Sequence, residues 1–191
     1  PGWLENESIW LHMEYKYLLE LLRSGLYEEY FASLQNTLVP FLDPQVYGRS
    51  ILENSSFIAS SANPNEKIHG RGFVARLSGS TAEFLHMWQI MMIGENPFTV
   101  EDGELTLSFA PALPAYLLPS DEPVKCKFLG DIEVNYHFKE VKDVMPGHTT
   151  IEKVELIYKC GRLHIAEGNK LSGALAEDVR NHQVKAIHIY A

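Results

Sequence analysis

Ser78 and Gly79 are the residues of this sequence whose types and position best suit anion chemistry. They stand just before an apolar segment, residues 81–93, that is predicted to be a helix. The first N–H groups of a helix lack partners within it, and the helix dipole draws negative charge to that end. A serine hydroxyl, together with a glycine that lets a ligand approach the backbone, would complete a small site for phosphate or a sugar oxyanion.

Ser80 and Glu83 offer a structural explanation of the same stretch. Their spacing fits a capping box, in which the Ser80 hydroxyl accepts a hydrogen bond from the Glu83 N–H and the Glu83 carboxylate bonds back to Ser80. Caps of this kind are widespread, so the local pattern alone favours a structural role. Ser78 and Gly79 are not needed for the cap and stay candidates for a ligand.

Three basic residues are candidates for a supporting role. Arg71 and Arg76 lie in the loop before this helix and could add positive charge to an anion site, but a solvated or carboxylate-paired arginine explains each equally well. His12 precedes the apolar stripe of the first predicted helix, where a satisfied polar histidine is the ordinary interpretation. The histidines and the pair Cys126 and Cys160 show no HExxH or CxxC spacing, so no metal site is predicted.

The composition indicates a globular protein. Of 191 residues, 46% are hydrophobic and 21% charged, which suits one domain, or a small domain joined to part of a larger one. The net charge is −9 and Lys and Arg form no run, which argues against a nucleic-acid partner and a polybasic membrane patch. No apolar run reaches the roughly 18 residues of a membrane span, and no leader opens the sequence, so we expect a soluble, cytoplasmic protein.

Helical spacing of apolar residues marks the first part of the chain. Residues 8–24 and 26–38 are predicted helices, separated by Gly25, and the short turn between them predicts antiparallel neighbours. The segment 81–93 is apolar on nearly every face, so we expect it to be buried all round.

The region between these helices, residues 41–75, loses periodicity, and loops of this length are usually functional or disordered. We expect an ordered, functional loop with apolar anchors at Tyr47, Ile51, Leu52, Phe57 and Ile58. After Gly94 the spacing alternates, which predicts antiparallel strands at residues 104–109, 125–129, 131–138, 151–158, 162–165 and 184–190.

Taken in order, the segments ENSSFIASSANPN, HGRGF, LSGSTAEF, MMIG and LTLSFAPALP resemble the C-terminal part of the cellobiose phosphorylase-like enzymes. These are inverting glycoside phosphorylases of glycoside hydrolase family 94 and the related β-glucan phosphorylases. The resemblance covers most of the chain, and LSGSTA and GELTLSFAPALP are its most specific blocks. It implies an α+β chain, with the last helices and active-site loop of an (α/α)6 barrel in residues 1–97 and an antiparallel β-sandwich in residues 98–191.

The resemblance also implies an activity. Members of this family cleave a β-glucosidic bond of a gluco-oligosaccharide with inorganic phosphate as co-substrate and no other cofactor, releasing α-glucose 1-phosphate with inversion. They bind phosphate through a Thr/Ser-Gly pair before a barrel helix and a histidine from an earlier helix, to which Ser78, Gly79 and His12 are similar. Their general acid is an aspartate on an earlier barrel segment that nothing in this chain resembles. We therefore expect the C-terminal portion of a longer phosphorylase, inactive alone.

Two other functions stay open at this point. An inverting hydrolase of the same fold would use water in place of phosphate and a second carboxylate as base. A non-catalytic carbohydrate-binding or scaffolding module would need no general acid. Related phosphorylases are often dimers, so the resemblance implies a homodimer as one state of the full-length enzyme.

Overall fold

The computed structural model describes residues 1–74 and 78–191. The chain divides into two compact units, Pro1–Trp88 and Gln89–Ala191, which are called the first and second unit below. The division falls inside a helix, whereas the sequence predicts a boundary between residues 97 and 98. Helices and sheets occur together, so the predicted α+β class is confirmed. No helix in the described part of the chain has both the length and the apolar character needed to cross a membrane.

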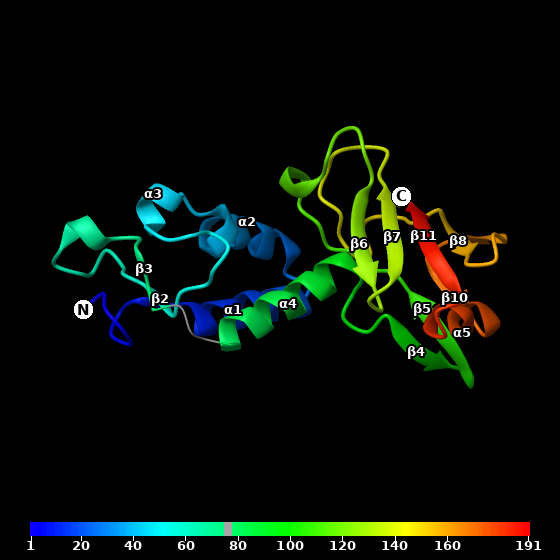
Figure 1. The fold of residues 1–191 in the computed structure, drawn as a ribbon, viewed down its shortest axis with the longest axis horizontal. Helices are drawn as coiled ribbons and strands as arrows, with labels where there is room; N and C mark the ends of the chain where they lie inside the picture. Colours follow the sequence, from blue (N-terminus) through cyan, green and yellow to red (C-terminus); the bar gives the residue numbers. More distant parts are fainter. Residues whose placement is uncertain (75–77) are drawn as a thin grey trace. The chain divides into compact units, whose positions relative to one another are not determined.

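The first unit combines helices with one small sheet (Figure 1). Its helical elements are α1 (Leu11–Arg23), α2 (Tyr27–Thr37), η1 (Val39–Phe41), α3 (Pro44–Tyr47), η2 (Glu66–Ile68) and the beginning of α4 (Ser78–Met92). The strands β1 (Ile9–Trp10), β2 (Phe57–Ile58) and β3 (Gly72–Phe73) form an antiparallel sheet in that order.

The predicted helix pair is confirmed as α1 and α2, which lie side by side in Figure 1. Near the start of α1, the Tyr15 Oη accepts a hydrogen bond of 3.2 Å from the N–H of Val39, which follows the end of α2. A contact between the start of one helix and the end of the other means that the two run antiparallel. The buried side of the pair is formed by Leu11, Tyr15, Leu18, Leu22, Tyr30, Phe31 and Leu34.

The long loop is ordered around the fully buried side chain of Tyr47. Its Oη donates to the Glu53 carbonyl at 3.0 Å and accepts from the Ser55 N–H at 2.9 Å. Gly72 must lack a side chain, because a Cβ there would lie 2.7 Å from the Tyr47 Cζ. Leu52 was expected as an anchor, but it is 93% exposed, so that expectation is wrong; it lies in the turn that the Glu53 N–H to Ser50 carbonyl bond closes.

The second unit contains two sheets (Figure 1). The strands β4 (Phe98–Glu101), β5 (Glu104–Ser108) and β10 (Lys170–Ser172) form an antiparallel sheet in the order β10-β5-β4. The strands β6 (Val124–Phe128), β7 (Ile132–His137), β8 (Lys153–Tyr158), β9 (Leu163–Glu167) and β11 (Val184–Tyr190) form the other sheet in the order β6-β7-β11-β8-β9. Each predicted strand is found, while β4, β10, the 3-10 turn η3 (Ala115–Leu117) and helix α5 (Ala174–Arg180) were not predicted.

The larger sheet is mixed and not antiparallel throughout, which corrects the expectation from the sequence. Strand β11 pairs antiparallel with β8 but parallel with β7, with Ile187 opposite Val134. A parallel pair needs a long crossover, and the chain between β7 and β11 provides it with the β8–β9 hairpin, β10 and α5.

Alternating residues of the larger sheet build the core of the second unit. Those that are fully buried on its strands are Ile132, Val134, Tyr136, Val154, Leu156, Val184, Ile187 and Ile189. The two sheets meet through aromatic rings: Phe98 and Phe128 stack at 5.8 Å between centroids, and Phe109 meets Phe128 edge-on at 6.3 Å.

Helix α4 is half covered, so the expectation that it is buried all round is wrong for this chain. Met87, Ile90 and Met91 are buried, but Leu85 is 61% and Trp88 37% exposed. The apolar composition of the segment was read correctly, but no element of the described chain lies over this side of the helix.

The C-terminal end of α4 is closed by the segment that follows β5. The carbonyl of Met91 accepts from the Ala112 N–H at 2.8 Å, and that of Ile93 accepts from the Ala110 N–H at 2.9 Å. The carbonyl of Met92 accepts from the buried Tyr136 hydroxyl. Carbonyls at a helix end have no intrahelical partner, so these bonds give the SFAPALP motif a structural role.

Candidate functional site

His12 is held in place by the short sheet of the first unit. Strand β1 ends at Trp10, opposite Phe57 of β2, and the Leu11 N–H donates to the Ser56 carbonyl at 3.1 Å. These bonds fix the start of α1, in which His12 is the second residue. One turn further on, the buried Tyr15 donates to the Asn54 Oδ1 at 2.9 Å, which ties α1 to the long loop.

The structure brings His12 against Gly79, the second residue of α4. A Cβ added to Gly79 would lie 2.7 Å from His12 Cε1 and 2.8 Å from both Nδ1 and Nε2. Near-equal distances to three adjacent ring atoms place that point above the ring face rather than at its edge. The imidazole therefore lies flat over the first turn of α4, and only glycine leaves room for it.

Glu83 follows Gly79 by four residues, on the same side of α4. Its Oε1 is 3.9 Å from His12 Nε2, an ion pair when the histidine is protonated. The His12 side chain is 32% exposed and that of Glu83 19%. Among the described residues, the His12 side chain has no hydrogen-bond partner. A ring nitrogen is therefore left for a ligand.

The other predicted site residues are placed as follows. Ser78 is the first residue of α4, beside Gly79, and its side chain lies outside the described part of the structure. Arg76 also lies outside the described residues. The Arg71 guanidinium covers Gly48, where an added Cβ would be 2.9 Å from its Nε. Arg71 therefore packs on the left-handed turn at Gly48, whose φ is 67°. Its described contacts do not include His12 or Gly79.

The predicted capping box is wrong in its geometry. Helix α4 begins at Ser78, so Ser80 is its third residue and not the residue before its first turn. Ser80 is fully buried inside the helix, and Glu83 faces His12 instead. The sequence singled out Glu83 for the wrong reason, because its partner comes from a helix distant in sequence.

These residues have the features that a small, one-sided anion site would need. The first turn of α4 offers N–H groups that have no intrahelical partner and the positive end of the helix dipole. His12 adds a donor that becomes a cation on protonation, and one face of its ring packs against Gly79. Among the described residues, no group of three or more His, Cys, Asp or Glu is arranged to hold a metal ion.

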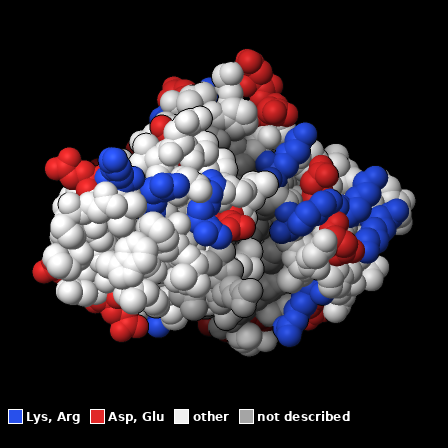
Figure 2. Space-filling model, turned by 60° about the vertical axis from the view of Figure 1, so that its left-hand side comes forward, with Lys and Arg blue, Asp and Glu red and all other residues white. Residues whose placement is uncertain are grey.

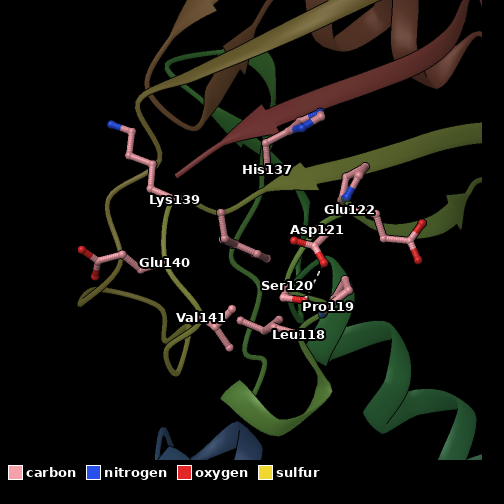
Figure 3. A pocket seen from close by; sticks show the side chains of 11 residues that line it. Leu118, Pro119, Ser120, Asp121, Glu122, His137, Lys139, Glu140 and Val141 are labelled. Carbon is pink, nitrogen blue, oxygen red and sulfur yellow. Dashed lines mark hydrogen bonds between the residues drawn. The ribbon is translucent and has the colours of Figure 1, made fainter.

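A pocket of about 270 Å3 in the second unit is less suited to an anion (Figure 3). Its lining includes the carboxylates of Asp121, Glu122 and Glu140. Ser120 donates to Asp121 at 3.0 Å, and Lys139, which extends outward in Figure 3, is paired with Glu152. Glu140 is paired with Lys142 at 3.0 Å, but the carboxylates of Asp121 and Glu122 still make this pocket a poor site for a phosphate.

Charges on the surface are mixed. Figure 2 shows Lys and Arg side chains interspersed with Asp and Glu on the face that it draws. Several are paired, among them Lys153 with Glu155 at 2.6 Å and Lys159 with Asp131 at 3.0 Å. In a chain whose net charge is −9, an anion site would therefore depend on local groups such as His12.

No protein family model matches the sequence, and no curated protein is similar to it at a significant level. The contact between His12 and the first turn of α4, and the resemblance of the surrounding motifs, are what bear on its function.

Proposed function

We propose that this chain is the C-terminal portion of an inverting glycoside phosphorylase that cleaves a β-glucosidic bond of a gluco-oligosaccharide with inorganic phosphate. The phosphate binds where His12 meets the first turn of α4, and α-glucose 1-phosphate is released. The supporting observation is the face-on contact between the His12 ring and Gly79. The resemblance pairs a histidine with a Ser-Gly far away in the sequence, and in this fold the histidine lies against the glycine of that pair.

The chemistry divides between this chain and a general acid outside it. For inversion, phosphate attacks the anomeric carbon from the face opposite the leaving oxygen. His12 and the first N–H groups of α4 hold the dianion in line without rearranging during the attack. An aspartate from an earlier barrel segment protonates the departing oxygen.

Two features support the architecture that goes with this function. The apolar side of α4 at Leu85 and Trp88 is exposed, as expected of a barrel helix whose other neighbours come from a longer polypeptide. The rings of Phe98, Phe109 and Phe128 join the two sheets of the second unit, which fits a β-sandwich.

The first test is phosphate binding by the 191-residue chain, measured by calorimetry with inorganic phosphate. We expect His12→Gln to weaken binding by at least about tenfold, since it removes the cationic donor. His164→Gln, on β9, is the matched control and should bind as the unchanged chain does. Equal binding by His12→Gln and the unchanged chain would contradict the site.

The second test is turnover by a longer polypeptide that adds the barrel segment with the general acid. We expect glucose 1-phosphate from a β-linked gluco-oligosaccharide, and a raised KM for phosphate in Ser78→Ala. Equal turnover with and without phosphate, giving free glucose, would support the hydrolase alternative. Sugar binding without any turnover would support the non-catalytic module.

A further inference from the structure

We propose that Glu83 is a positioning residue for His12: its carboxylate holds the Nε2 side of the ring and so turns Nδ1 toward the bound anion. This rests on the proposed phosphate site for the identity of the anion. The pairing of Glu83 with His12 is itself independent of phosphate.

The geometry leaves the ring little choice of orientation. Gly79 lies under the imidazole face, so the ring cannot tip toward α4 without clashing. What remains is a half-turn about the Cβ–Cγ bond, which keeps a ring face on Gly79 but exchanges the positions of nitrogen and carbon atoms. Glu83, 3.9 Å from Nε2, favours the orientation found here. A small movement of this carboxylate closes a charge-assisted hydrogen bond, after which Nδ1 is the nitrogen left for a ligand.

Glu83 is the acidic group that faces the ring among the described residues. It comes from α4, the helix packed against His12, and its side chain is 19% exposed, so solvent screens it only in part. On α1 itself, Lys16 lies one turn from His12 and is exposed, while Glu14, two residues away, does not share its face. Glu83 is therefore the charged group placed to hold the Nε2 side of the ring.

The consequence is that phosphate binding depends on a hydrogen-bond acceptor at residue 83 more than on the charge of that residue. Glu83 also repels the phosphate itself, so orientation of the ring and repulsion of the ligand have opposite effects on affinity. A side chain that keeps the acceptor but lacks the charge separates the two.

The test is the phosphate affinity of Glu83→Ala and Glu83→Gln in the 191-residue chain, measured by calorimetry. We expect Glu83→Ala to weaken binding by about three- to tenfold, because the ring loses the group that orients it. Glu83→Gln should bind within about threefold of the unchanged chain, because its amide oxygen still accepts from Nε2–H and it no longer repels the phosphate. Glu29→Ala on the surface of α2 is the matched control and should bind as the unchanged chain does. An unchanged affinity in Glu83→Ala, or an equal loss in both Glu83 variants, would overturn the proposal.

A second measurement separates this inference from the proposed function. In the absence of phosphate, thermal unfolding of His12→Ala, Glu83→Ala and the double variant should be non-additive by about 1 to 2 °C. Additivity would refute the pairing, whatever phosphate does. Non-additivity without phosphate binding would refute the phosphate site and leave the pairing intact.

Discussion

The space above Gly79 is filled by the imidazole of His12, so this glycine has a steric reason to lack a side chain. Its backbone N–H is a candidate ligand for phosphate, and the absent Cβ is what lets the histidine approach the same turn. The two roles can be separated by a substitution that keeps the N–H and fills the space.

Gly79→Ala tests the steric role directly. With His12 present, we expect it to destabilise the chain by about 1 to 3 kcal/mol, because the new methyl group must push the ring away. In a His12→Ala background the space is empty, and alanine should stabilise the helix by up to about 1 kcal/mol relative to glycine. Urea unfolding of the four proteins measures both values. The same cost in both backgrounds would contradict the packing of His12 on α4.

At this scale the sequence singled out individual residues but not their partners. His12, Ser78 and Gly79 were named from motif resemblance, and of these the fold places His12 against Gly79. Glu83 was interpreted as part of a cap, because Ser78 and Ser80 both suit a helix start and local spacing does not distinguish them. No local pattern could indicate that a histidine of another helix faces Glu83.

At the scale of the elements, β7 and β11 join through a pair of histidines. His137 Nε2 and His188 Nδ1 are 2.9 Å apart, and the His137 ring stacks on Tyr190 at 4.5 Å between centroids. Desolvation, and then the neighbouring His188, lower the pKa of His137 below its usual value. The folded state therefore binds this proton less readily than the unfolded state.

This shift predicts a loss of stability in mild acid. The contribution of His137 is complete above the unfolded-state value of about 6.5 and is lost as the pH falls from there toward the lower folded-state pKa. His137→Phe keeps a ring against Tyr190 but does not titrate, so its urea midpoint should fall less between pH 7.5 and 5.0 than that of the unchanged chain. His164→Phe, on β9, is the control and should show the full loss. An equal loss in His137→Phe would refute this role.

The helices and strands were predictable where the spacing of apolar residues along the sequence distinguishes one from the other. Alternation located β7 and β11, but it specifies which face of a strand is buried and says nothing of which strand lies beside it, so the parallel pair was missed. The short β10 and α5 were missed because three and seven residues carry too little periodicity.

At the scale of the whole molecule, the exposed side of α4 offers a test of the proposed barrel. In the 191-residue chain, Leu85→Ala should cost no more than about 0.5 kcal/mol, while Met87→Ala, buried two residues away, should cost about 2 to 5 kcal/mol. In a longer polypeptide that completes the barrel, Leu85→Ala should become as costly as Met87→Ala. Chemical unfolding of both variants in both polypeptides measures this, and a Leu85→Ala cost that stays small in the longer one would argue against a covered α4.

The order of strands in the larger sheet has a consequence for how the protein is made. Strand β11 lies in the middle, yet it follows in sequence both hairpins that it joins, β6–β7 and β8–β9. During synthesis the ribosome delivers these hairpins first, with the edges of β7 and β8 open until β11 emerges. Open strand edges recruit other strands, so this interval is when the nascent chain most needs a chaperone.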